Sequence, residues 1–171
     1  MTAVLFENIS ELRTVSVLGT LANAAIVADD GRIAWIGPTT QAPAADTRIN
    51  LGGRAVLPGW VDSHTHMLFD GNRAAEFEAR MAGQSYAAGG INVTVTATRA
   101  ATDTRLEQLL HDRINAARAG GTTTLETKTG YGLDVESERR AARIAATGVD
   151  DVTFLGAHVT PVGADPDDYV D

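Results

Sequence analysis

The sequence contains no cysteine, no long run of apolar residues and no excess of basic residues. Without cysteine there are no disulfides and no thiolate metal sites, which leaves histidine and carboxylate side chains as the strong metal ligands. No apolar stretch approaches the roughly 20 residues of a membrane helix, and the first residues lack the basic end and apolar core of a signal peptide. We therefore expect a soluble, cytoplasmic protein.

The acidic balance also limits the partners. Lys and Arg number 14 against 22 Asp and Glu, giving a net charge of -8. Binding to nucleic acid requires a basic face, so nucleic acid is excluded as the main partner. With 44% hydrophobic and 21% charged residues, the 171-residue chain is long and apolar enough to form a globular core.

The organisation of the chain changes near Pro58. Before it, short apolar segments alternate with turns, and Asp29-Asp30-Gly31 between residues 25–28 and 32–37 predicts a β-hairpin. Residues 48–51 and 54–57 are predicted as two more short strands. The first 57 residues are therefore expected to form a small β-rich unit.

From Pro58 the pattern predicts strands that alternate with helices. The predicted strands cover 58–66, 122–127 and 152–158, and the predicted helices cover 73–81, 103–118 and 134–146. Thr102-Asp103 and Asp134 are predicted to cap the second and third of these helices. Val93–Ala97 is predicted as a short extended piece, and the acidic segment 165–168 as a loop that leads into a helix. This alternation indicates parallel β/α units and an α/β fold class.

Two histidines, His64 and His66, end the first of these strands. Side chains alternate along a strand, so the two imidazoles are expected on one side, with Thr65 on the other. Neutral imidazole is a good ligand for zinc or iron, and two on one face can bind the same ion. A chance pair of surface or core histidines is the alternative interpretation.

Polar residues follow the other two strands as well. Lys128 and Tyr131 come after the second strand and His158 ends the third. In β/α barrels the active site lies at the carboxyl ends of the strands, so these positions favour a functional site. We interpret Lys128 as structural or electrostatic, with Glu126 as a partner of a nearby basic group, and His111 as a solvent-facing helix residue.

Three segments carry a family resemblance. The run PGWVDSHTHMLFDGNRAAEFEAR resembles the metal-binding segment of the amidohydrolase superfamily, and ETKTGYGLD and TFLGAHVTP narrow the resemblance to the imidazolonepropionase family. The resemblance implies a metal-dependent-hydrolase β/α barrel, of which residues 58–171 would be the first part, with about three strands. Residues 1–57 would be part of a small composite β domain.

The resemblance also implies an activity and a site. The family opens the ring of 4-imidazolone-5-propanoate by hydrolysis, giving N-formimidoyl-L-glutamate in histidine degradation. His64 and His66 resemble the first two ligands of its single zinc or iron ion. The residues similar to its substrate contacts are Arg73, Tyr86, Tyr131 and His158. Each has a structural alternative: a surface arginine, a packing tyrosine or a core histidine.

The chain is shorter than the family fold. A β/α barrel takes about 250 residues, and only three barrel strands are predicted before Asp171. The resemblance places the remaining metal ligands and the proton-transfer residue on later strands, so no catalytic residue is assigned here. We expect an N-terminal fragment, inactive alone, whose full-length parent is a homodimer.

Two other functions stay open at this point. Another amidohydrolase, such as a dihydroorotase or a deaminase, would need His64 and His66 but not Arg73 or the segment around Tyr131. A non-catalytic module that binds a carboxylate-bearing small molecule would need Arg73 but no metal.

Overall fold

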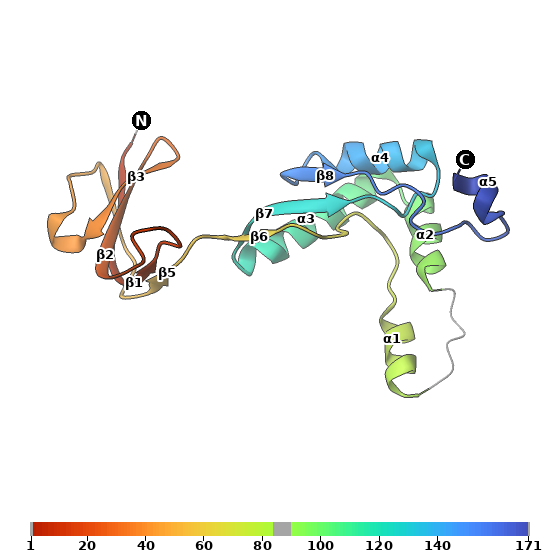
Figure 1. Cartoon of the computed structure of the whole chain (residues 1–171), viewed down its shortest axis with the longest axis horizontal. Helices are drawn as coiled ribbons and strands as arrows, with labels where there is room; N and C mark the ends of the chain where they lie inside the picture. The colour runs from red at the N-terminus through yellow and green to blue at the C-terminus, as the bar shows by residue number, and fades with distance from the viewer. Residues whose placement is uncertain (1, 84–89, 171) are drawn as a thin grey trace. The chain divides into compact units, whose positions relative to one another are not determined.

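The computed structural model describes residues 2–83 and 90–170 and divides the chain into two units, Met1–Pro58 and Gly59–Asp171 (Figure 1). Within the described residues, the first unit consists of strands and one 3-10 turn, η1 (Thr39–Gln41), whereas the second alternates strands with helices. Each unit has its own buried hydrophobic clusters. The architecture therefore changes at Pro58.

The first unit is a mixed β-sheet. Its strands are β1 (Val4–Arg13), β2 (Thr20–Asp29), β3 (Arg32–Pro38), β4 (Thr47–Asn50) and β5 (Ala55–Val56). Their order is β3-β2-β1-β4, and β5 also pairs with β1. Strand β2 runs antiparallel to β1 and β3, whereas β4 and β5 run parallel to β1. The sheet buries two clusters of side chains, one of Leu5, Ala25 and Val27 and one of Ile9, Leu12 and Ala24.

The predicted hairpin is present between β2 and β3. Asp29 pairs with Arg32, so Asp30 and Gly31 form a two-residue turn. Both have a positive φ, 50° for Asp30 and 71° for Gly31. Two positive φ angles match a type I′ turn, in which aspartate or asparagine followed by glycine is favoured.

Strand β1, which lies inside this sheet, was not predicted from the sequence. Its apolar residues do not alternate regularly, because the register shifts between Phe6 and Ile9 and Asn8 adopts a positive φ of 58°. A bulge of this kind adds a residue and shifts the pattern from one face of the strand to the other. Simple alternation therefore fails for β1, although Leu5, Ile9 and Leu12 are all buried.

The second unit contains three parallel strands and five helices among its described residues. The strands are β6 (Trp60–Asp62), β7 (Thr122–Lys128) and β8 (Asp151–Thr153), with β7 in the middle. The helices are α1 (Ala74–Met81), α2 (Ile91–Ala100), α3 (Asp103–Ala119), α4 (Val135–Ala145) and α5 (Pro166–Val170). None of the helices in the described part of the chain is long and apolar enough to span a membrane.

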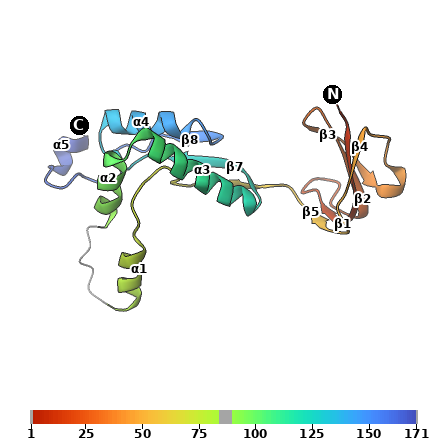
Figure 2. The ribbon, with the colours of Figure 1, turned by 180° about the vertical axis from the view of Figure 1, so that it is seen from behind.

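Helices α3 and α4 pack on one face of this sheet, as the two opposite views show (Figure 2). The buried stripe of α3 is Leu106, Leu110 and Ile114, spaced by four residues so that all three side chains lie on one face. These leucines and the isoleucine meet Leu125 of β7 and Ile144 of α4 in one cluster. On β6, by contrast, the side chains are exposed.

Both long helices begin at the residues predicted from the sequence. The Thr102 side chain accepts a hydrogen bond from the backbone N–H of Arg105 at 3.2 Å, which caps α3. The Asp134 carboxylate accepts from the N–H of Ser137 at 2.8 Å, which caps α4. Each cap binds one of the backbone N–H groups that the first turn of a helix leaves unpaired.

The extended piece predicted for Val93–Ala97 is wrong, because these residues lie within helix α2. β-Branched residues favour strands, but burial can override this weak preference. Thr94, Val95 and Thr98 are buried on one side of α2, and Thr98 Oγ1 accepts a hydrogen bond from Asp70 N at 3.0 Å. Tertiary packing therefore determines the helix.

The first and third strands of the second unit are shorter than predicted. In these two predicted strands, only residues Trp60–Asp62 and Asp151–Thr153 pair with β7. The following residues are held partly by side chains: Thr127 Oγ1 accepts from Met67 N at 2.8 Å, and Thr129 Oγ1 accepts from Leu155 N at 3.1 Å. Period-2 patterning cannot distinguish such a segment from a true strand.

Candidate functional site

Four of the predicted site residues lie together where the three parallel strands end. His64 and His66 follow β6, Tyr131 follows β7 and His158 follows β8. The ring centroid of His66 lies 5.6 Å from those of His64 and Tyr131, and 5.2 Å from that of His158, onto which it stacks. The Tyr131 and His158 centroids are 5.7 Å apart. The sheet thus brings residues from three separate segments into one cluster.

The histidine pair is attached to β7 through Thr65, the residue between them. Thr65 Oγ1 donates to the carbonyl of Glu126 at 2.6 Å, and the Thr65 carbonyl accepts from Lys128 N at 2.8 Å. The Glu126 carboxylate accepts from Lys128 Nζ at 2.7 Å and from Thr65 N at 3.3 Å. This pairing fixes the backbone that carries both imidazoles and leaves Lys128 bound to a carboxylate beside them.

The Glu126 carboxyl group is held in its charged form. Burial alone would raise its pKa, but the hydrogen bonds from Lys128, Thr153 and Thr65 outweigh this and lower the pKa below its usual value. The negative charge of Glu126 and the positive charge of Lys128 cancel, as expected for an ion pair that is largely shielded from solvent.

In the described part of the chain, His66 combines an unpartnered ring nitrogen with a lowered pKa. Its Nδ1 is buried and, within the described residues, is the only buried side-chain nitrogen or oxygen without a hydrogen-bond partner. Burial lowers the pKa of His66, and the nearby His158, His64 and Lys128 lower it further. Metals bind the neutral imidazole, so both observations fit a metal ligand. However, residues 2–83 and 90–170 contain no group of three or more His, Asp and Glu that could hold an ion.

His158 is oriented by the loop that follows β7. Its Nδ1 lies 3.1 Å from the carbonyl oxygen of Gly130, and a carbonyl oxygen can only accept. Nδ1 therefore carries a proton, and in the neutral imidazole Nε2 is then an acceptor. His158 is half-buried against His66 and Tyr131 rather than in a hydrophobic core.

Arg73 and Tyr131 line a pocket of about 420 Å³ next to the histidine cluster. Its wall also includes Phe69, Asn72 and Phe77. Arg73 binds Glu76 in a two-pronged ion pair, through Nε at 3.0 Å and Nη2 at 2.7 Å. Burial raises the pKa of Tyr131, so its phenol stays protonated and can donate a hydrogen bond. The pocket thus combines apolar walls with a cation and a hydroxyl group.

Two residues that support the pocket, Arg113 and Phe69, were not predicted from the sequence. Arg113 of α3 donates to the carbonyls of Met67 and Phe69, both at 2.7 Å, and its guanidinium lies 3.6 Å from the centre of the Phe69 ring. Phe69 in turn contacts Tyr131 edge-on at 5.8 Å. Arg113 could have been found from the sequence, because it lies at helical spacing beside the buried stripe of α3, where a charged side chain needs a partner.

The remaining predictions have different outcomes. Tyr86 lies outside the described residues. His111 is exposed on α3, where its Nδ1 contacts the carbonyl of Glu107 at 2.7 Å, so the solvent-facing interpretation is confirmed. Lys128 is paired with Glu126, in agreement with an electrostatic role.

Comparison with known proteins shows which proteins this chain is similar to. No family model matches the sequence. The imidazolonepropionases of Micrococcus luteus and Saccharopolyspora erythraea are each 62% identical to it, over 177 and 172 aligned residues that cover 100% of this chain. Along its whole length, this chain is similar to imidazolonepropionases. It spans 44% of the length of these two imidazolonepropionases and 45% of that of a third, from Mycolicibacterium smegmatis, which is 53% identical.

Solved structures show a shared fold. An amidohydrolase matches 90% of this chain with a TM-score of 0.56 and 18% identity, covering 32% of that structure. A triazine hydrolase variant matches 90% with a TM-score of 0.58, covering 36%, at 19% identity. Atrazine chlorohydrolase from Arthrobacter aurescens, complexed with zinc, matches 88% with a TM-score of 0.52, covering 35%, at 17% identity. The α/β fold of this chain is therefore similar to the folds of these three proteins.

Proposed function

We propose that the protein carrying this sequence hydrolyses 4-imidazolone-5-propanoate to N-formimidoyl-L-glutamate. The observation that carries this proposal is the 62% identity to imidazolonepropionases along the whole chain. The site supports it independently, because the pocket contains a cation and a phenol, and the phenol lies next to His158 and to a histidine pair suited to a metal. A small, polar ring that bears a carboxylate fits this combination of groups.

His64 and His66 are the proposed ligands of one divalent metal ion, zinc or iron. The unpartnered Nδ1 and the lowered pKa of His66 support this assignment, as does the zinc complex of the atrazine chlorohydrolase. When bound in such a site, a metal ion polarises a carbonyl and lowers the pKa of bound water to about 7. Catalytic zinc takes about three protein ligands, so further ligands must come from residues outside the described set.

Arg73, Tyr131 and His158 are the proposed substrate contacts, and Tyr86 is proposed with them from the family resemblance. Arg73 would bind the propanoate carboxylate, for which its planar guanidinium is suited; the ion pair with Glu76 fixes the plane of that group. Tyr131 would donate a hydrogen bond, and the Nε2 of His158 would accept one from a ring N–H. Together they would hold the ring in one orientation.

The longer protein is part of the same proposal. Residues 58–171 would supply about the first three strands of a β/α barrel, and residues 1–57 part of a composite β domain. The residue that transfers the proton to the leaving nitrogen would lie beyond Asp171, so the segment alone would be inactive. We call the complete chain the full-length protein; a cytoplasmic homodimer is proposed for it.

The role of Arg73 provides the test. In the full-length protein, Arg73→Lys should raise the KM for 4-imidazolone-5-propanoate by about a hundred-fold, because a bidentate charged contact is replaced by a single point charge. The matched control is Arg139→Lys, at an exposed arginine that also pairs with a glutamate three residues away. Equal KM values for both variants would contradict the carboxylate-binding role and favour an amidohydrolase with a different substrate.

A further inference from the structure

Glu138 is the most deeply buried carboxylate in the described part of the second unit, and the site described above does not use it. Its side chain is 3% exposed although it lies in the first turn of α4. Both carboxylate oxygens point back to the loop after β7: Oε2 accepts from Gly130 N at 2.7 Å, and Oε1 accepts from Gly132 N at 2.7 Å and from Leu133 N at 2.9 Å. One side chain thus binds three backbone groups on both sides of Tyr131.

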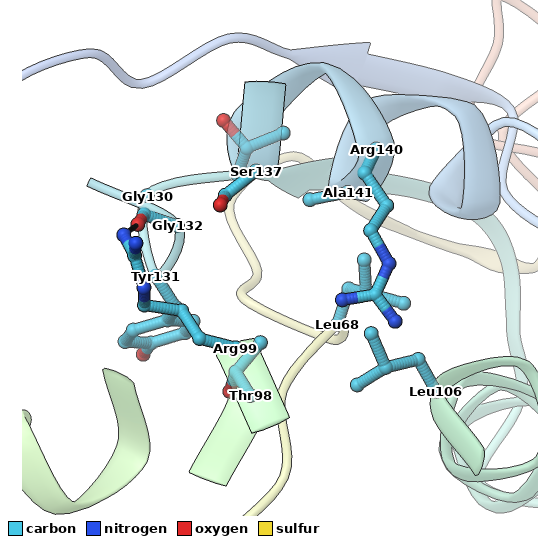
Figure 3. A pocket seen from close by; sticks show the side chains of 11 residues that line it. Leu68, Thr98, Arg99, Leu106, Gly130, Tyr131, Gly132, Ser137, Arg140 and Ala141 are labelled. Carbon is cyan, nitrogen blue, oxygen red and sulfur yellow. Dashed lines mark hydrogen bonds between the residues drawn. The ribbon is translucent and has the colours of Figure 1, made fainter. Parts of the chain in front are cut away.

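The same loop is held from its other side. The Arg99 guanidinium of α2 donates to the carbonyl of Gly132 and pairs with Asp134 at 2.6 Å, and Tyr169 Oη donates to the carbonyl of Leu133 at 3.1 Å. Figure 3 shows Arg99 reaching Gly132, with Ser137 of α4 nearby. The cavity next to the loop is only about 10 Å³, which is about the size of one water.

The loop has no room to shift toward its neighbours. A Cβ on Gly132 would lie 2.7 Å from the backbone nitrogen of Glu138, and a Cβ on Gly130 would lie 2.7 Å from Nδ1 of His158. Leu133 adopts a positive φ of 61°, which costs energy for a residue with a side chain. Its N–H bond to Glu138 holds it in this conformation.

We propose that Glu138 is the positioning residue of the substrate site. It fixes the backbone on both sides of Tyr131, which turns the phenol toward the pocket. Through Gly130, whose carbonyl accepts from His158, it also sets the orientation of the imidazole. Its three charge-assisted hydrogen bonds define one conformation of the loop before substrate binds. This inference rests on the proposed function for the identity of the substrate.

Glu138→Gln in the full-length protein tests the proposal. Glutamine keeps one oxygen for Gly132 and Leu133, but its amide group then faces the N–H of Gly130, donor against donor. We expect the KM for 4-imidazolone-5-propanoate to rise about ten-fold, the effect of losing one hydrogen bond to a charged group, with a smaller change in kcat. Amide hydrogen exchange over residues 130–133 should speed up by a similar factor.

Glu136→Gln is the matched control. It removes the same charge from the same helical turn, but Glu136 is exposed and pairs with Arg139. A role limited to helix stability predicts equal effects of the two substitutions. An unchanged exchange rate at residues 130–133 in Glu138→Gln, or faster exchange with an unchanged KM, would overturn the inference. If the wild type fails to turn over the imidazolone, the proposed function fails, and the exchange rates alone decide whether Glu138 holds the loop.

Discussion

At the scale of the single residue, the support for a proposed metal site comes mainly from His66. Its buried Nδ1 has no hydrogen-bond partner among residues 2–83 and 90–170, and burial with three nearby basic groups keeps its pKa low. The sequence predicted the pair from its spacing, and the two rings lie 5.6 Å apart. The buried Nδ1 could not be predicted in this way, because it depends on the neighbours that Tyr131 and His158 provide from distant segments.

His66→Ala should abolish stoichiometric metal binding by the full-length protein. Changes to groups around a metal ligand cost about 10- to 100-fold in affinity, and the loss of a ligand should exceed that range. Metal per chain, measured by plasma mass spectrometry after dialysis, checks this expectation. His111→Ala is the control, because His111 is exposed on α3. The same metal content in both variants would remove His66 from the ligand set.

The lowered pKa of Glu126 predicts that the stability of the protein depends on pH. Its folded-state pKa lies below the usual 4.5, so its contribution to stability is present above about pH 4.5 and is lost as the pH falls through the folded-state value. Glu126→Gln should therefore weaken the acid-induced decrease in the free energy of unfolding below pH 4.5. At pH 7 it should destabilise by about 1–3 kcal/mol, because Lys128 loses its partner.

Unfolding by urea across pH 3–7 measures this difference. Glu107→Gln, at an exposed position on α3, is the comparison and should follow the wild type. If Glu126→Gln shows the wild-type pH profile, the carboxylate does not have the pairing described here.

At the scale of the element, local signals predicted best where the interaction is itself local. The caps of α3 and α4 and the turn at Asp30-Gly31 depend on neighbouring residues, and all three are present as predicted. The predictions failed where contacts between residues distant in the sequence decide the structure. The β-branched residues of α2 are helical because one side of this helix is buried within the second unit. In the central strand β1, a bulge hides the alternation of apolar and polar residues.

Asp134→Ala should destabilise the protein by about 1 kcal/mol, the usual effect of removing a helix N-cap. Asp134 binds the N–H and the hydroxyl of Ser137 and pairs with Arg99, so the change releases the start of α4. Thermal unfolding compares it with Glu136→Ala, a neighbouring acidic residue outside the cap. Equal stability of the two variants would contradict a capping role.

At the scale of the whole molecule, the sequence predicted the class of fold and the strands that carry the site. Parallel strands separated by helices place chemistry at their carboxyl ends, which is where His66, Tyr131 and His158 meet. The loop network of Glu138 and the Arg113–Phe69 contact were not predictable. They join backbone groups and side chains whose proximity arises only after the helices have packed on the sheet.

The proposed site is that of a hydrolase for a carboxylate-bearing imidazolone. The most direct measurement is turnover of 4-imidazolone-5-propanoate by the full-length, metal-loaded protein, with dihydroorotate as the competing substrate and N-formimidoyl-L-glutamate identified as the product. We predict rapid turnover of the imidazolone, no turnover of dihydroorotate, and loss of activity when the metal is removed. No turnover of the imidazolone by protein that contains about one metal ion per chain would contradict the account.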